Sequence, residues 1–191
     1  MSSTNRLNAS KRHVADYYVT PQEEIRVFLR HFKDDEGLDL SSLFFRDPCA
    51  GGDEKNGMSY PEVLSRDYDA KRIETMDIRE DSRAEKKEDF LLASPEPADV
   101  TITNPPFNLA MPIIEKALTT TRWGGYVVML LRLNFLGSKS RRDFWNRYPA
   151  HKIYVHHKRM SFTEDGATDS IEYAHFVWKI GSVQETTLRV I

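Results

Sequence analysis

The stretch Asp99–Leu118, DVTITNPPFNLAMPIIEKAL, joins a β-branched run to an apolar helical pattern through two adjacent prolines. The run from Val100 to Thr103 has the composition of a buried strand. Two prolines end such a strand, because they donate no backbone hydrogen bond and fix φ. Apolar residues then recur at helical spacing from about Leu109. The stretch predicts a strand, a rigid turn and a helix, the unit of a parallel α/β sheet.

The same alternation extends over the rest of the chain. Thr20 and Ser140 are predicted N-caps for two further helices, and Gly124-Gly125 is predicted to break the chain before a strand. Further strands are predicted over 42–48, 72–78, 126–132, 152–157 and 171–180, with a helix over 59–66. The last two strands have no helix between them. The pattern predicts an α/β fold with a mostly parallel sheet and a C-terminal antiparallel hairpin.

Length and composition fit a single domain over residues 1–191, with residues 1–15 as a flexible arm. One cysteine, Cys49, excludes a disulfide framework and favours a reducing cytoplasm. No apolar run is long enough to span a bilayer, so we expect a soluble protein. Three histidines, at 151, 156 and 157, form no zinc pattern with one cysteine, so we expect no metal.

The net charge of −2 does not by itself indicate a nucleic-acid partner. Local basic runs at 138–147, which holds Arg141 and Arg142, and at 156–159 are the candidates for phosphate contacts. A solvated basic surface is an equally good interpretation of both runs.

Three polar residues stand at predicted strand ends: Asp47, Asp77 and Asn104. Ligands of parallel α/β sheets bind beyond the carboxyl ends of the strands, so we expect these side chains to face one crevice. The loop after Asp47, DPCAGGD, lacks both the Gly-x-Gly-x-x-Gly pattern and the lysine of a P-loop. An aspartate there suits a cationic ligand, although a structural turn is an alternative. Asp77 could bind ribose hydroxyls, or be a surface aspartate.

Asn104 offers a side-chain carbonyl, and Pro105 a backbone carbonyl, at a separation that the two prolines hold fixed. An exocyclic NH2 group has two donors that match these acceptors. Phe107 supplies a flat surface for a base. The motif therefore indicates a clamp for an aromatic amine or an amide.

These motifs resemble the amino-methyltransferases that use S-adenosylmethionine, and in particular the small phage-type DNA N6-adenine methyltransferases. The resemblance rests on DYYVTP at 16–21, DPCAGG at 47–52, NPPF at 104–107 and the segment 159–178. It implies a Rossmann-like S-adenosylmethionine-dependent methyltransferase fold that ends in a reversed hairpin. It also implies S-adenosylmethionine as cofactor, DNA as substrate and a bacterial cytoplasm as location. The implied catalytic residues are Asn104, Pro105, Pro106 and Phe107. The cofactor residues are expected to be Thr20, Pro21, Asp47, Pro48, Cys49, Ala50, Gly51, Asp77, Ile78, Asp89 and Phe90. The substrate residues are expected to be Phe107, Phe162, Arg141 and Arg142.

No long insertion separates the motifs, so we expect no separate target-recognition domain and relaxed sequence specificity. Related Asn-Pro-Pro-aromatic enzymes leave other substrates open: guanine N2 or adenine N6 in RNA, or a protein glutamine. A methyltransferase-like protein that binds a partner without catalysis is the alternative from another class.

Overall fold

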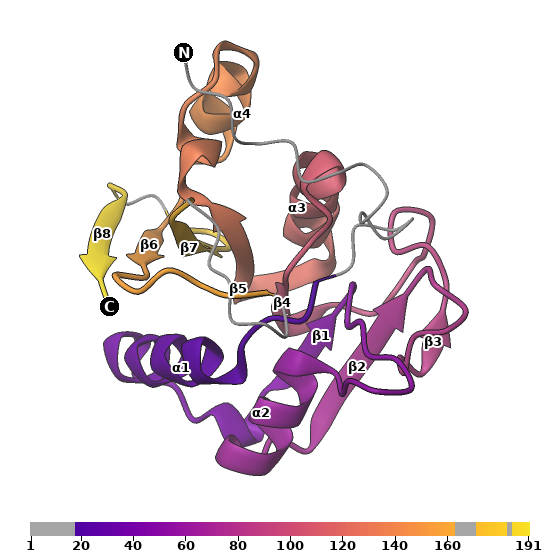
Figure 1. The fold of residues 1–191 in the computed structure, drawn as a ribbon. Helices are drawn as coiled ribbons and strands as arrows, with labels where there is room; N and C mark the ends of the chain where they lie inside the picture. Colours follow the sequence, from indigo (N-terminus) through magenta and orange to yellow (C-terminus); the bar gives the residue numbers. More distant parts are fainter. Residues whose placement is uncertain (1–17, 163–170, 183–184) are drawn as a thin grey trace, which may run out of the picture.

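The computed structural model describes residues 18–162, 171–182 and 185–191. Within these ranges the chain forms a sheet of eight strands in the order β3-β2-β1-β4-β5-β7-β6-β8 (Figure 1). The strands are β1 Phe44–Asp47, β2 Arg72–Asp77, β3 Lys86–Lys87, β4 Ala98–Thr103, β5 Thr121–Arg132, β6 Lys152–Val155, β7 Tyr173–Lys179 and β8 Thr187–Val190. The predicted arm at residues 1–15 lies outside the described residues.

Strands β3, β2, β1, β4 and β5 pair in parallel, as predicted. Strand β7 lies between β5 and β6 and runs antiparallel to both. The predicted antiparallel hairpin is therefore confirmed as the pairing of β6 with β7. Strands β3 and β8 were not predicted. Strand β3 has two residues, and β8 is an edge strand whose four residues are all exposed.

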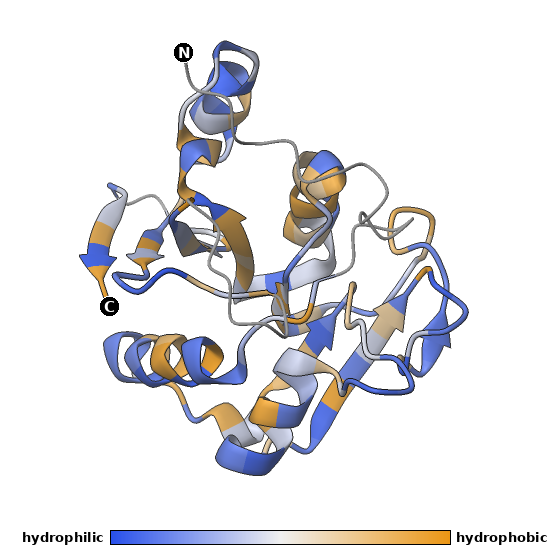
Figure 2. Cartoon of the chain, viewed as in Figure 1, coloured by the Kyte–Doolittle hydropathy of each residue, from blue (hydrophilic) through white to orange (hydrophobic). Residues whose placement is uncertain are grey.

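Helices cover both faces of the sheet (Figure 1). They are α1 Gln22–Glu36, α2 Ser59–Tyr68, α3 Ala110–Thr120 and α4 Arg142–Arg147, with short 3-10 turns at Leu40–Ser42, Phe107–Leu109, Leu133–Leu136 and Lys139–Arg141. Helices α1 and α2 share one core cluster with Tyr126 and Val128 of β5. Helix α3 packs in a second cluster with Val127 and Met129. Successive residues of β5 thus supply both cores, and its second half has the hydrophobic colour in Figure 2.

Two predicted helix caps are wrong. Pro21 occupies the N-cap position of helix α1 and has no side-chain acceptor, while Thr20, one residue earlier, accepts a hydrogen bond from Asn104. Ser140 does not cap the last helix either. The 3-10 turn before α4 is capped by Ser138, whose hydroxyl accepts from the Ser140 N–H. Short polar side chains bind any nearby donor, so tertiary contacts override the local pattern.

The Gly124-Gly125 pair lies inside β5 rather than before it. The register of β5 against β4 shifts at this point, between Ala98 and Val100. A Cβ at Gly125 would lie 2.5 Å from the backbone oxygen of Asp99 in β4. Glycine therefore permits the close approach of these two strands, and with it the position of Asn104 at the end of β4.

We expect Gly125→Ala to destabilise the protein by about 1–3 kcal/mol, because the added methyl group forces two backbones apart. Gly137→Ala is the matched control, since the nearest atom to its Cβ would lie 4.0 Å away. That variant should stay within about 0.5 kcal/mol of the parent. Urea unfolding curves measure both changes. Equal stabilities for the two variants would contradict this account of the β4–β5 contact.

Candidate active site

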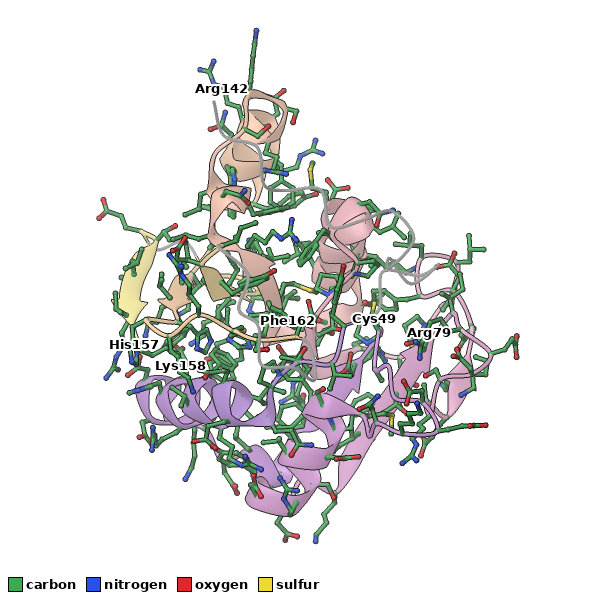
Figure 3. The ribbon with its side chains drawn as sticks, in the orientation of Figure 1. Cys49, Arg79, Arg142, His157, Lys158 and Phe162 are labelled. Atoms are coloured by element: carbon green, nitrogen blue, oxygen red, sulfur yellow. The ribbon has the colours of Figure 1, made fainter. Side chains whose placement is uncertain are left out.

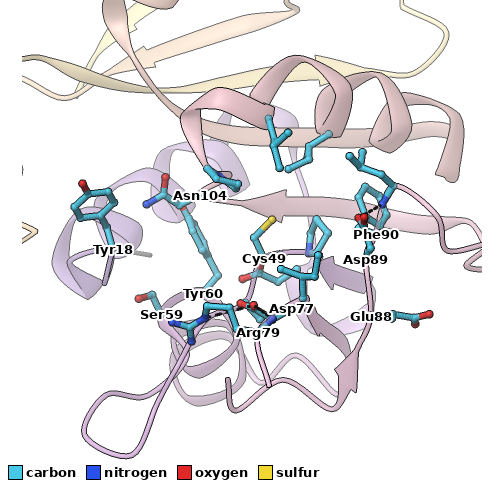
Figure 4. Close-up of a pocket in the computed structure, with 18 of the residues that line it drawn as sticks. Tyr18, Cys49, Ser59, Tyr60, Asp77, Arg79, Glu88, Asp89, Phe90 and Asn104 are labelled. Carbon is cyan, nitrogen blue, oxygen red and sulfur yellow. Dashed lines mark hydrogen bonds and ion pairs between the residues drawn. The ribbon is translucent and has the colours of Figure 1, made fainter. Parts of the chain in front are cut away.

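The carboxyl ends of three neighbouring strands meet at one edge of the sheet. Asp47 is the last residue of β1, Asp77 is the last residue of β2, and Asn104 directly follows β4. All three line one pocket with an empty volume of about 840 Å³ (Figure 4). The pocket lies beyond the carboxyl ends of the strands, where parallel α/β sheets bind their ligands.

Asp77 fixes the glycine loop that follows β1. Its Oδ2 accepts the Gly51 N–H at 2.9 Å, and its Oδ1 accepts the Arg79 N–H at 2.8 Å. Gly51 and Gly52 have φ angles of 68° and 75°, which favour glycine. The loop is therefore shaped by the carboxylate at the end of the neighbouring strand.

Asp47 is buried and has a raised pKa of about 7. Burial is the main cause, and the nearby Asp77 carboxylate raises the pKa further. Arg79 lies near Asp77, with its Nε 3.5 Å from Oδ1. Asp47 has no comparable ion pair among the described residues. This pocket wall therefore fits a cationic ligand.

The Cys49 thiol also lines the pocket. Burial raises its pKa well above the usual value, and the Asp47 and Asp77 carboxylates raise it further. The thiol stays protonated at neutral pH and is a poor nucleophile.

The opposite end of the pocket is more apolar. Figure 4 shows Asp89 and Phe90 there, away from Tyr18 and Asn104. The Asp89 carboxylate accepts the Leu91 N–H at 2.9 Å, and Phe90 is buried. Ile78 also lines the pocket although it is 63% exposed. This end suits a flat ring with polar edges.

Asn104 has a fixed orientation. Its Nδ2 donates a hydrogen bond of 3.0 Å to Oγ1 of the buried Thr20. The amide oxygen, Oδ1, therefore remains as the acceptor of this side chain. Pro105 is buried behind it, and Pro106 lines the pocket.

Four aromatic rings gather beside this motif. Phe107 is 6.5 Å from Tyr18 and 6.2 Å from Tyr173, measured between ring centroids. Phe162 lies 4.8 Å from Tyr173 and 6.1 Å from Tyr18. The Arg132 guanidinium lies over the Phe107 ring at 4.3 Å. We call the rings of Tyr18, Phe107, Phe162 and Tyr173 the aromatic group. It brings together Phe107 and Phe162, which are 55 residues apart in the sequence.

Some predicted site residues lie outside the pocket lining. Pro21, Gly51, Pro105, Phe107 and Phe162 do not line it, although they adjoin residues that do. The predicted roles of all these residues stay predictions.

Arg141 and Arg142 lie on a projection, residues 133–147, that we call the α4 arm. Arg141 donates to the Phe135 carbonyl at 3.2 Å and stacks on the Phe135 ring, so it is engaged within the arm. Arg142 is exposed and lies far from Phe162 and Cys49 (Figure 3).

Several lining residues were not predicted: Tyr18, Ser59, Tyr60 and Arg79. Arg79 follows Asp77 by two residues, so its place near the strand end could have been found. Tyr60 gave no such signal, because its apolar ring fits the buried face of α2.

Among the described residues, no cluster of three His, Cys, Asp or Glu side chains could hold a metal ion. No helix in the described ranges is long and apolar enough to cross a membrane.

No protein-family model matches the chain, and no curated protein matches it in sequence. Solved structures do match. A Listeria monocytogenes protein, provisionally described as a class I S-adenosylmethionine-dependent methyltransferase, has a TM-score of 0.66 and 13% identity. The match covers 91% of this chain but 65% of that protein, slightly under two thirds of its length.

Two further structures show the range of substrates on this fold. A Pyrococcus horikoshii protein, provisionally described as an RNA methyltransferase, has a TM-score of 0.61 and 16% identity over 87% of this chain and 89% of its own. The M protein of the type I restriction enzyme EcoKI has a TM-score of 0.54 and 15% identity over 76% of this chain and 42% of its own. The chain thus has the fold of class I S-adenosylmethionine-dependent methyltransferases, and these identities show the fold alone.

We expect the affinity of this pocket for a cationic ligand, measured with S-adenosylmethionine as the probe, to rise about tenfold between pH 6 and pH 8. The reason is that a cationic ligand prefers ionised Asp47, whose pKa in the ligand-free protein is about 7. Near pH 7, binding should then release about half a proton. Calorimetry in two buffers of different ionisation enthalpy measures both quantities.

The control is Asp47→Asn, which should bind more weakly and without this pH dependence. Burial makes the folded, ligand-free protein favour the neutral form of Asp47. Protonated Asp47 therefore adds to the free energy of unfolding at acidic pH, and this contribution is lost as the pH rises through about 7. A flat affinity from pH 6 to 8 in the parent protein would refute the assignment of Asp47.

Proposed function

We propose that this protein transfers a methyl group from S-adenosylmethionine to the N6 amine of adenine in DNA. The observation that carries the proposal is the orientation of Asn104. One N–H of the Asn104 amide donates to Thr20, which orients the amide, and the amide oxygen can accept a donor from a ligand.

The exocyclic amine of adenine is a poor nucleophile, because its lone pair is delocalised into the ring. The Asn104 amide oxygen and the Pro105 carbonyl would each accept one of its N–H bonds. Two acceptors held by a rigid Pro-Pro turn would draw the nitrogen towards tetrahedral geometry and free the lone pair. Positioning of the amine against the methyl donor is then the main source of rate acceleration.

The pocket has residues that fit the cofactor. S-adenosylmethionine would supply an activated, cationic methyl donor. Asp47 and the glycine loop suit its charged methionine part, because Asp47 is buried without an ion pair among the described residues. Asp77 suits the ribose hydroxyls, and Asp89 with Phe90 suits the adenine. The protonated Cys49 thiol takes no covalent part.

The aromatic group favours a nucleobase over a glutamine amide as substrate. A planar base can stack on Phe107 or Phe162, while a glutamine side chain offers no ring. In duplex DNA the base must first be flipped out, at roughly a few kcal/mol. The α4 arm carries the basic residues Lys139, Arg141, Arg142 and Arg147 against one acid, Asp143, and Lys139, Arg142 and Arg147 are exposed. It is a candidate contact for phosphates.

DNA is preferred to RNA on the motif resemblance, and the EcoKI likeness is consistent with it. RNA remains the second candidate, because the Pyrococcus protein shares the fold. A purely binding role is disfavoured, because the glycine loop and the oriented Asn104 would serve no purpose in it. We propose relaxed sequence specificity, because the described residues form one sheet with its helices and leave no separate unit among them to read a long DNA site.

A methyl-transfer assay with labelled S-adenosylmethionine tests the proposal. Duplex DNA, single-stranded DNA, structured RNA and a protein extract are offered in parallel, and the modified product is identified by mass. We expect N6-methyldeoxyadenosine, reduced about 100-fold or more in Asn104→Ala, because such preorganised polar groups typically contribute that much.

Asn108→Ala is the matched control, because Asn108 is exposed and does not line the pocket. It should transfer methyl groups at the parent rate. Label confined to RNA or protein would mean that Asn104 and Pro105 bind an amine or amide of that substrate, and it would contradict DNA as the substrate. An absence of label in every substrate would refute the proposal.

The Thr20 contact gives a separate prediction. Thr20→Val keeps the shape of the side chain but removes the acceptor for the Asn104 amide. We expect kcat to fall about tenfold, since one hydrogen bond that orients the amide is lost. Thr20→Ser keeps the hydroxyl and should retain most of the activity. Steady-state kinetics with DNA compares them, and equal kcat values for the two variants would show that the contact does not orient the amide.

A further inference from the structure

Two buried histidines connect the wall of the pocket to helix α1. His156 follows β6 and His175 lies in β7, and they are 2% and 0% exposed. Tyr60 of α2 stands at one end and Glu24 of α1 at the other, and both are also buried. We call these four residues the polar array. It lies within the core on the α1 and α2 side of the sheet, where Phe28 stacks on the His175 ring at 4.0 Å.

Two hydrogen bonds join Tyr60, His175 and His156, and a contact without hydrogen-bond geometry adds Glu24. Tyr60 Oη lies 2.9 Å from His175 Nε2, and His175 Nδ1 lies 2.8 Å from His156 Nε2. His156 Nδ1 lies 3.3 Å from Glu24 Oε2. The array ends near the surface, where the exposed Lys158 approaches Glu24 (Figure 3).

Two of these contacts are hydrogen bonds, and a consistent assignment of their protons exists with both imidazoles neutral. Tyr60 then donates to His175 Nε2, and His175 Nδ1 donates to His156 Nε2. The Nδ1 atom of His156 makes no hydrogen bond, so its approach to Glu24 is a contact only. Burial lowers the pKa of His156 to about 4 and that of His175 well below its usual range, which keeps both neutral.

The fold itself does not require these polar groups. Buried polar side chains add desolvation costs that apolar residues of the same shape would avoid. The array reaches the site through Tyr60, which lines the pocket together with Asp47. A chain of hydrogen bonds that ends at a pocket wall can hold that wall in one position.

We propose that His175, supported by His156, is a positioning residue that holds the Tyr60 ring as a fixed wall of the cofactor pocket. The role is in binding: it lowers the Kd for S-adenosylmethionine and leaves the transfer step unchanged. This inference rests on the proposed cofactor, and it assigns a function to buried residues of α2 and β7.

Calorimetric titration with S-adenosylmethionine tests it on the full chain. Tyr60→Phe and His175→Phe should each raise the Kd about fivefold, because each removes the same hydrogen bond and preserves an aromatic ring. The double variant should bind no more weakly than either single variant. At saturating cofactor, kcat should change less than about twofold.

Tyr154→Phe is the matched control. Tyr154 is also fully buried, and its hydroxyl donates to Asp35 at 3.0 Å, but it does not line the pocket. It should lose stability without any change in the Kd. If His175→Phe does not fold, Tyr60→Phe against Tyr154→Phe still decides the question.

The outcomes separate the two proposals. A parent protein that binds no S-adenosylmethionine refutes the proposed function, and this inference with it. A parent that binds, with an unchanged Kd in Tyr60→Phe, refutes the positioning role alone and leaves the array as part of the core.

Discussion

The site depends on one constraint, the parallel pairing of β1 with β2 on one side and β4 on the other. Parallel strands bring their carboxyl ends to the same edge, so residues far apart in sequence meet there. Asp47, Asp77 and Asn104 form the pocket for this reason. The close contact of Gly125 in β5 with β4 then sets the position of the end of β4. The hydrogen bond from the Gly51 N–H to Asp77 sets the position of the glycine loop.

Charge and hydrogen bonding divide the pocket into two functions. The buried carboxyl groups at the ends of β1 and β2 suit a cationic ligand with hydroxyls. The Asn104 amide at the end of β4 donates one N–H to Thr20 and can accept a hydrogen bond through its oxygen. The methyl donor and the amine that accepts the methyl group would therefore meet at the boundary between these two regions. This complementarity, rather than the fold, is the argument for amine methylation, since related folds carry other substrates.

Sequence patterns predicted the parallel sheet, the main helices and the polar strand ends, because hydrophobic periodicity and strand-end position are local properties. They failed where tertiary contacts decide. Thr20 has the local signature of a helix cap, and its partner Asn104 is 84 residues away. Tyr60 and His175 look like ordinary core residues of a helix and a strand, and only the packing of α2 against β7 joins them. The edge strand β8 has no buried residue, so its sequence carries no hydrophobic pattern, and only its pairing with β6 makes it a strand.

The most direct test of the central claim is a crystal structure of the protein with a non-reactive S-adenosylmethionine analogue and an adenine-containing oligonucleotide. The account predicts that the adenine N6 lies about 3 Å from both the Asn104 amide oxygen and the Pro105 carbonyl oxygen, with the base stacked on Phe107. The sulfonium should lie on the line that passes through N6 and the methyl position. An adenine whose amine is held by other groups, or a cofactor bound away from Asp47 and Asp77, would contradict it.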